Sequence, residues 1–352
     1  MVDLLSAAEY KLDHAKQDAG KKAWKALLGD FLAYYSINLV RHNELAEAEA
    51  WQTKLEQLEP LSARSLEVKA RLLGKQKNSA AAVPFLKKLA DSDNKLVRPV
   101  AHILEEIGQT AAAEQMFEKY AAESKEAERV LALAAFLGRQ NRPREALDVC
   151  DRAWKTCPPE AVSSTSAAIL YLAKSAGPQY QRVASRLEQA IVDHPDKPAL
   201  LADLASVRCL QGRHDDALKL LQQASARDKS NSVVQNNIAW LLVFAGKTDE
   251  AWVAIEKAIS IRGEQTNLLG TRAVIHMAKG RYNEAIRDLE TAIFDRPTAV
   301  NYFHLAQAHF GAKNQTAALQ ALDRGKSLGL TESSVDPLER TAYQQLMQID
   351  RR

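Results

Sequence analysis

Three glycines, Gly212, Gly246 and Gly280, stand 34 residues apart in the stretch from Pro198 to Ala299. Alanines keep the same spacing, first as Ala217, Ala251 and Ala285 and then as Ala224, Ala258 and Ala292. A fixed period of this length predicts a stack of similar structural units. Such a chain needs no single large core, because each unit buries its apolar side chains against its neighbours.

Each period has the pattern of two helices joined by a turn, as residues 266–299 illustrate. Apolar and small residues recur at helical spacing on both sides of the turn: Leu269, Ala273 and His276 before it, and Ala285, Leu289 and Ala292 after it. Gly280 tolerates a positive φ between the helices, and Pro297 cannot continue the second one. The small alanines allow two antiparallel helices to approach closely.

This pattern resembles that of the tetratricopeptide repeat family. One unit reads Leu201, Leu204, Ala205, Gly212, Ala217, Leu221 and Ala224, and the next reads Ile238, Ala239, Leu242, Gly246, Ala251, Ile255 and Ala258. The resemblance implies an all-α fold, namely a right-handed superhelical solenoid of antiparallel helix pairs in a bacterial-type array. The exact period holds over three consecutive units, which makes the resemblance specific there.

The same register can be carried through the rest of the chain. It predicts four divergent repeats in 29–160, at 29–62, 63–93, 94–126 and 127–160, which keep the turn glycine only at Gly108. An irregular unit follows at 161–197, where Gly177-Pro178 predicts a longer turn. Four regular repeats then fill 198–331.

Both ends of the chain depart from the repeat pattern. In 1–28 we expect a helix over residues 3–19, ended by Gly20, as a cap or the remnant of a truncated repeat. In 332–352 we expect a C-terminal capping helix, with Asp336 as N-cap and Glu339 three residues later.

The composition narrows the class of protein. The content is 46% hydrophobic but only 6% aromatic, which favours an all-α fold, and the net charge of +3 is too small to indicate nucleic-acid binding. No run of about 18 apolar residues predicts a membrane span. Three cysteines without metal-binding spacing indicate a reducing compartment. The N-terminal residues have no secretory pattern, so we expect a cytoplasmic location.

Candidate catalytic residues are few. His214-Asp215-Asp216 and His194-Pro195-Asp196 occupy turns between helices, where polar residues begin the next helix. No glycine-rich phosphate loop and no nucleophile elbow is present. The sequence therefore predicts a protein that is not an enzyme and that holds no cofactor and no metal.

The resemblance also implies a binding surface, since the first helices of tetratricopeptide repeats line a concave groove that binds peptides. In the C-terminal repeats it assigns aromatic, apolar and amide side chains to that groove: Asn236, Asn237, Trp240, Phe244, Asn267, Met277, Phe303, Gln307 and Phe310. Some family members use an Asn at the position of Asn237 to bind a peptide backbone. The alternative, that the rings only pack between neighbouring helices, stays open.

In the N-terminal repeats the same positions carry mostly charged side chains. The basic ones are Arg64, Arg71, Lys75, Lys95, Arg98 and Arg139. We expect them to attract an acidic portion of a bound partner. The alternative is an ordinary solvated face.

Together these features predict a non-catalytic scaffold that binds a protein or peptide segment, not nucleic acid, in its groove. Two other functions stay open. The chain could be a substrate-docking module of a larger enzyme or of a secretion or assembly machine, which the unpaired first helix favours. RNA-binding helical repeats are the second, but they require a basic or aromatic code in every repeat, which this sequence lacks.

Overall fold

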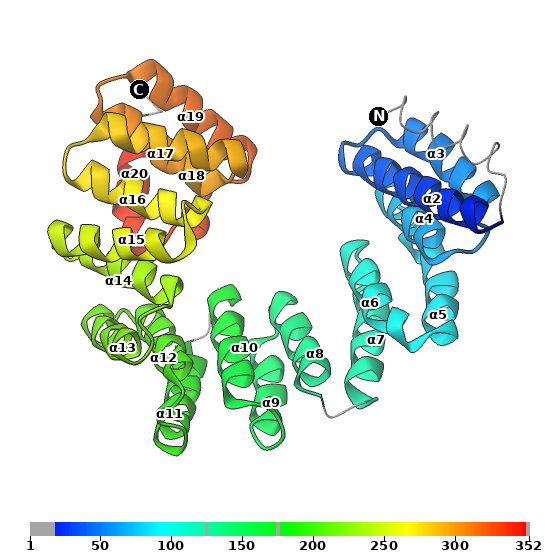
Figure 1. Ribbon diagram of the computed structural model, residues 1–352, viewed down its shortest axis with the longest axis horizontal. Coiled ribbons are helices and arrows are strands. Elements are labelled where there is room, and N and C mark those ends of the chain that lie inside the picture. Colours follow the sequence, from blue (N-terminus) through cyan, green and yellow to red (C-terminus); the bar gives the residue numbers. More distant parts are fainter. Residues whose placement is uncertain (1–17, 124–125, 174–176, 350–352) are drawn as a thin grey trace. The chain divides into compact units, whose positions relative to one another are not determined.

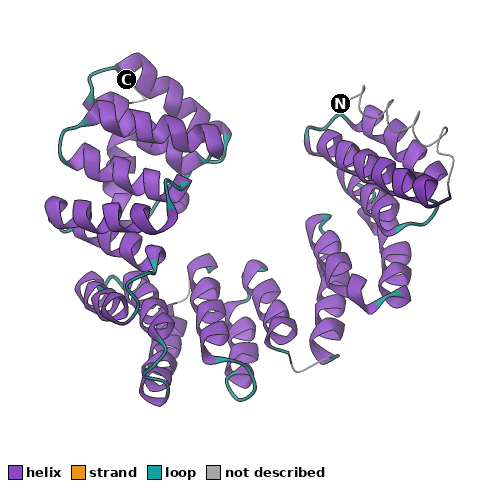
Figure 2. Cartoon of the chain, viewed as in Figure 1, coloured by secondary structure: helices purple, strands orange, loops and turns teal. Residues whose placement is uncertain are grey.

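The structure, a computed structural model, describes residues 18–123, 126–173 and 177–349. Every regular element among these residues is a helix, and none is a strand (Figure 2). The predicted all-α fold is therefore confirmed. The chain divides into two compact parts, Met1–Thr165 and Ser166–Arg352, which we call the N-terminal and the C-terminal part.

The N-terminal part consists of consecutive helices that pair in sequence order (Figure 1). They are α2 (Asp18–Arg41), α3 (Leu45–Leu58), α4 (Ala63–Lys75), α5 (Val83–Ser92), α6 (Val97–Glu106), α7 (Thr110–Ala122), α8 (Ala127–Arg139) and α9 (Pro143–Ala153), with 3-10 turns η1 (Ser79–Ala82) and η2 (Asn94–Leu96) around α5. The pairs α4/α5, α6/α7 and α8/α9 lie within 63–93, 94–126 and 127–160, whereas α2 begins before residue 29.

The helix α10 (Pro159–Leu172) spans the boundary, and the C-terminal part continues the pairing. Its helices are α11 (Gly177–Asp193), α12 (Pro198–Leu210), α13 (His214–Arg227), α14 (Ser232–Phe244), α15 (Thr248–Arg262), α16 (Thr266–Ala278), α17 (Tyr282–Asp295), α18 (Ala299–Gly311) and α19 (Gln315–Ser327). Two 3-10 turns, η3 (Glu332–Ser334) and η4 (Pro337–Glu339), then lead into α20 (Arg340–Ile349).

The periodic alanines form the contact between the two helices of each pair. Ala217, Ala251 and Ala285 are 0% exposed, as are Ala258 and Ala292. A methyl group at these positions lets the helix axes come close, and larger side chains above and below fill the remaining space. The resulting cores are continuous from one pair to the next, since buried residues of α12 to α16 form a single apolar cluster.

The turn between the paired helices keeps its backbone conformation even where glycine is lost. Gly246 and Gly280 have φ of 76° and 72°, and Lys313 occupies the corresponding turn of the last pair with φ of 62°. Asn43, Lys77 and Asn141 do the same in the divergent repeats, with φ of 64°, 59° and 56°. The turn geometry is thus set by the packing of the helices and not by glycine alone.

Two expectations for the irregular regions need correction. Gly20 does not end a helix, because it lies inside α2, which begins at Asp18; most of the expected helix at 3–19 lies outside the described residues. Gly177 and Pro178 themselves belong to α11, which is 17 residues long, and the turn before them, 174–176, lies outside the described residues. Proline is well tolerated in the first turn of a helix, where its missing N–H has no intrahelical partner.

Candidate partner-binding groove

The first helices of the last four pairs, α12, α14, α16 and α18, provide the face on which the sequence predicts a groove. On α14, Trp240 and Phe244 lie one helical turn apart, and their ring centroids are 4.9 Å apart. Trp240 is half-buried, whereas Phe244 is 36% exposed. Phe310, on α18, is 39% exposed. This face therefore does present aromatic side chains beyond those needed for the core.

Residues that follow the last helix pair, up to residue 349, lie on this same face. We call residues 331–349 the tail segment. Its Val335 and Leu346 are buried in the apolar cluster that includes Phe303 of α18. The Tyr343 ring lies 6.0 Å from that of Phe303. The tail segment therefore folds back over the first helices, instead of covering only the end of the last repeat.

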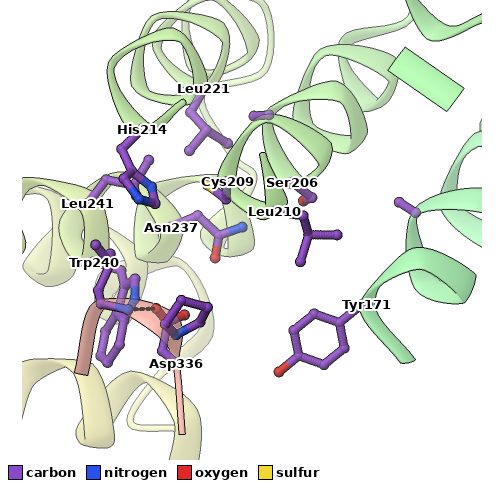
Figure 3. A pocket seen from close by; sticks show the side chains of 14 residues that line it. Tyr171, Ser206, Cys209, Leu210, His214, Leu221, Asn237, Trp240, Leu241 and Asp336 are labelled. Carbon is purple, nitrogen blue, oxygen red and sulfur yellow. Dashed lines mark hydrogen bonds between the residues drawn. The ribbon is translucent and has the colours of Figure 1, made fainter. Parts of the chain in front are cut away.

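Two acidic side chains fasten the tail segment to the groove. Glu339 lies 2.7 Å from Nε2 of His304 on α18, and both residues are 3% exposed. Trp240 also forms a side-chain hydrogen bond with the Asp336 carboxylate, and the two residues lie close together (Figure 3). Between them, Leu338 packs against the apolar cluster of α12 to α16. An acidic, an aliphatic and a second acidic residue thus contact the groove within four positions.

The sequence predicts that Asp336 and Glu339 begin the terminal helix as N-cap and capping-box residue, and the structure agrees for Asp336 but not for Glu339. Asp336 accepts a hydrogen bond of 2.9 Å from the backbone N–H of Leu338, as an N-cap does. Glu339 does not close a capping box, because its carboxylate contacts His304. Between Asp336 and α20 the chain forms the 3-10 turn η4.

The Asp336 carboxyl lies in a weakly polar environment. Burial raises its pKa above the usual value, against the hydrogen bonds from Leu338 and Trp240, which favour the charged form. Burial, followed by the charge of Asp336, raises the pKa of the Cys209 thiol to about 11. Cys209 is therefore protonated at neutral pH, and its chemistry is that of a packing residue.

A pocket of about 200 Å³ lies beside Asp336 (Figure 3). Its walls come from α10, α12, α13, α14 and the tail segment: Ala167, Tyr171, Ala205, Ser206, Cys209, Leu210, His214, Leu221, Asn237, Trp240, Leu241, Asp336, Pro337 and Leu338. The buried Nδ1 atom of His214 has no hydrogen-bond partner within the described chain. The pocket thus combines apolar walls with a histidine nitrogen that has no hydrogen-bond partner in the described chain.

A second cleft, of about 410 Å³, opens on the other side of Glu339. It lies between α14, α16, α18 and α20 and is lined by Val243, Phe244, Val274, Met277, Ala278, Tyr282, Gln307, Phe310, Gly311, Glu339, Ala342, Gln345 and Leu346. Its apolar rim holds the two partly exposed rings, Phe244 and Phe310. The tail segment therefore covers the groove without filling it.

The predicted groove residues fall into four groups. Asn237 and Trp240 line the first pocket, whereas Phe244, Met277, Gln307 and Phe310 line the second. Phe303 is 0% exposed and belongs to the core in this conformation. Asn236 is half-buried, with a buried Oδ1 atom that has no partner among the described residues, and Asn267 is exposed; neither lines a pocket.

The basic residues predicted for the N-terminal repeats are mostly paired with carboxylates of neighbouring repeats. Arg139 of α8 makes two hydrogen bonds of 2.9 Å to Glu105 of α6. Three further pairs join first helices, namely Arg64 with Asp30, Arg71 with Glu106 and Arg98 with Glu128. Lys75 and Lys95 are exposed, and the described part of the chain gives them no ion pair. The excess positive charge on this face is accordingly smaller than the sequence suggests.

One of these pairs affects the ionisation of its carboxylate. Burial opposes ionisation of Glu105, but the hydrogen bonds and charge of Arg139 outweigh it and lower the pKa of the carboxyl. Glu105 is therefore ionised at neutral pH and holds the guanidinium of Arg139 in a two-bond arrangement.

Several residues of the groove were not identified from the sequence. The sequence predicts only a helix start at Asp336-Pro337-Leu338-Glu339, and it does not single out His304. One sequence feature could have indicated that this segment contacts the groove. Asp336 and Glu339 are two carboxylates three residues apart in a segment that does not follow the repeat pattern.

No helix in the described ranges is long and apolar enough to cross a membrane. Within the same ranges, no three His, Cys, Asp or Glu side chains converge in an arrangement suited to a metal ion.

Comparisons with known proteins identify repeats in two stretches of the chain. One tetratricopeptide repeat family model matches residues 176–241, and another matches residues 271–329. No curated protein matches the chain by sequence. Among solved structures, yeast Tom70 is similar over 99% of this chain and 96% of its own, with 14% identity and a TM-score of 0.53.

A second solved structure, the thermophilic tetratricopeptide repeat protein TTC0263 of Thermus thermophilus, matches 54% of this chain and 99% of its own, with 17% identity and a TM-score of 0.44. The likeness to Tom70 concerns the fold. The 34-residue period, the helix pairs of the structure and the two family matches lead to one conclusion: the chain contains tetratricopeptide repeats, matched over residues 176–241 and 271–329.

Proposed function

We propose that this protein is a non-catalytic scaffold for protein–protein interaction, and that it binds a segment of a protein partner in the groove of α12, α14, α16 and α18. Tetratricopeptide repeats support the general role. The partner-binding residues we assign to the groove are those that line its two pockets: Asn237, Trp240, Phe244, Met277, Gln307 and Phe310.

One observation carries this proposal: the groove is already in contact with a peptide segment, the tail segment of the same chain. That segment uses the contacts expected of a bound ligand, namely apolar anchors and two buried acidic side chains. The helices therefore present a surface that is able to bind a short helical or extended segment.

The part of the groove that the tail segment leaves uncovered could bind a partner. Phe244 and Phe310 are 36% and 39% exposed at the rim of the second cleft. Aromatic rings of this kind are typical anchors at interfaces, because they bury much apolar area at a small cost in side-chain entropy. A partner that covers both rings gains about 25 cal/mol for each Å² of apolar surface removed from water, before ordering costs.

The proposal can be tested by site-specific photo-crosslinking in the source cell. A photoreactive phenylalanine analogue at Phe310 would lie on the rim of the groove. The same analogue at Phe294 on α17, which is 93% exposed and lines neither pocket, provides the control. We expect crosslinks from position 310 to map to one continuous segment of a partner, and no such product from position 294.

A second measurement keeps the result specific. The crosslinked segment, made as a synthetic peptide, should bind the purified chain in a one-to-one ratio and lose affinity for the Phe310→Ala variant. Scattered crosslinks at both positions, or a peptide that binds both forms equally, would contradict groove binding.

The other functions considered from the sequence have less support. Use of the chain as a docking module of a larger assembly is compatible with the same groove and would be revealed by the identity of the crosslinked partner. RNA binding is disfavoured, because four arginines of the N-terminal repeats are engaged with carboxylates. A cytoplasmic location remains a prediction.

A further inference from the structure

We propose that the tail segment, residues 331–349, is an internal competitor of the groove, and that the partner segment carries the same chemistry: an acidic residue, a large aliphatic residue two positions later and a second acidic residue directly after it. This inference rests on the proposed function and specifies its ligand. In the absence of a partner, the tail segment occupies the site that the partner needs.

The chemistry of the ligand follows from the contacts of the tail segment. Glu339 is 3% exposed and lies 2.7 Å from the equally buried His304. Asp336 accepts the indole N–H of Trp240. A buried carboxylate is tolerated only where a donor or a positive charge is provided, so these two positions of the groove select acidic side chains. Leu338 packs between them on the apolar surface.

The competition follows from the overlap of the two binding surfaces. Trp240 contacts the tail segment through Asp336, and the same ring is part of the predicted partner surface. Glu339 and Leu346 form one wall of the cleft whose other walls hold Phe244 and Phe310. A partner segment cannot use this surface fully while the tail segment is docked. Its apparent affinity is reduced by the fraction of molecules whose groove is free.

The first pocket offers a means of displacing the tail segment. The amide side chain of Asn237 points into the pocket beside Asp336 and Tyr171 (Figure 3). Within the described chain, Asn237 makes no side-chain hydrogen bond, and Tyr171 is 78% exposed. A partner backbone that extends into this pocket would gain hydrogen bonds that the tail segment does not make. These additional hydrogen bonds would allow a separate partner molecule to displace the tail segment of the same chain.

The experiment uses a fluorescent synthetic peptide with the sequence of residues 331–349 as the probe. It is titrated into the full chain and into the Asp336→Asn/Glu339→Gln double variant, whose own tail segment is weakened while its groove is unchanged. We expect the double variant to bind the peptide about tenfold more tightly or better, because its groove is free more often. Circular dichroism establishes that the variant remains helical, and a Leu338→Ala chain provides a second, milder form.

Controls define which groups are recognised. A peptide with Glu332→Gln, at an exposed position of the tail segment, should bind as the original does. A peptide with both Asp336→Asn and Glu339→Gln should lose binding. Adding Trp240→Phe to the double-variant chain removes the indole donor but keeps an aromatic ring, and should weaken the binding of the original peptide.

Three results would overturn the inference. Equal affinity of the peptide for the original and the variant chains would show that the tail segment does not compete. Equal binding of the original and the doubly substituted peptide would show that the groove does not recognise the two acidic side chains. A concentration-dependent dimer, formed by exchange of tail segments, would assign the groove to a second copy of the chain.

The inference and the proposed function fail separately. Crosslinks from position 310 to a partner segment that lacks the acidic pattern would leave the groove as a binding site and remove only the predicted ligand chemistry. Tight peptide binding without any crosslinked partner in the source cell would leave the tail segment as an internal ligand and remove the scaffold function.

Discussion

Glu339 of the tail segment lies 2.7 Å from Nε2 of His304, and the side chains of both residues are at most 4% exposed. The two residues are 35 positions apart in the sequence. A contact of this kind is costly to break, since removal of one partner leaves the other polar group buried without a hydrogen bond. It therefore fixes the register of the tail segment against α18.

The first prediction concerns this contact. His304→Ala should release the tail segment, because the Glu339 carboxylate would lose its buried partner on α18 and would favour exposure to water. Hydrogen exchange at the amides of α20 should accelerate, by a factor that corresponds to about 3 kcal/mol of lost protection. Glu332→Gln, an exposed position in the same segment, should leave exchange unchanged. Equal protection in the His304 variant would show that apolar contacts alone hold the segment.

The second prediction concerns the packing within a repeat. Ala251 is 0% exposed at the contact between α14 and α15. Ala251→Leu should overfill this contact and destabilise the C-terminal part by about 1–3 kcal/mol, seen as a lower midpoint of urea unfolding. Val253→Leu, on the same helix but 68% exposed, is the matched control and should have little effect. Unchanged stability of the Ala251 variant would mean that the helix contact has room to adapt.

The third prediction concerns the turn conformation. Lys313 has φ of 62° in the turn between α18 and α19, where the preceding repeats have glycine. Lys313→Gly should stabilise the chain by about 0.5–1 kcal/mol, because the left-handed strain that it removes exceeds the added freedom of the unfolded chain. The reverse change, Gly280→Ala, should cost a similar amount; no atom lies within 4 Å of the added Cβ, so the loss would report the backbone alone. A destabilised Lys313→Gly variant would contradict this account.

The fourth prediction concerns pH. Burial lowers the pKa of His276 below its ordinary value of 6.5, against the attraction of Asp288. The unfolded chain then binds more protons than the folded chain below about pH 6.5, so the stability contributed by neutral His276 is present above this pH and declines as the pH falls through it. His276→Gln should reduce the dependence of the urea midpoint on pH between about 7.5 and 5.5.

Two comparisons make the pH measurement specific. Burial also lowers the pKa of His102 and His309, so the dependence should be reduced and not abolished. His42→Gln, at an exposed position, serves as the control for the loss of a histidine. If the slope is the same in the original chain and in the His276 variant, protonation of this residue does not contribute to unfolding.

The fold could be predicted because its main determinant is local and periodic. The spacing of Ala217, Ala251 and Ala285 defines which face of each second helix meets the first, and the same register locates the helix pairs even where Gly is replaced, as at Lys313. These features depend on neighbours within one or two repeats. Each repeat of a periodic sequence therefore indicates the same helix pairing independently.

The contents of the groove could not be predicted in the same way. Docking of Glu339 on His304 depends on how a non-repeating segment crosses several helices, and no spacing rule connects the two positions. Trp240 lines the first pocket from α14, but its hydrogen bond to Asp336 depends on the path of the tail segment. Asp336 was recognised by its local role as an N-cap, which is compatible with many destinations for the helix that follows.

The ion pairs between first helices of the N-terminal repeats have a consequence for cooperativity. Arg64, Arg71, Arg98 and Arg139 each join one repeat to an adjacent one, from α2 through α8. In a linear array, such nearest-neighbour terms determine how many repeats unfold together. Salt screens partly exposed ion pairs, so ionic strength weakens the coupling between adjacent repeats. It therefore determines how many of these repeats unfold together. High salt should make these repeats behave more independently, while the apolar contacts of each helix pair persist.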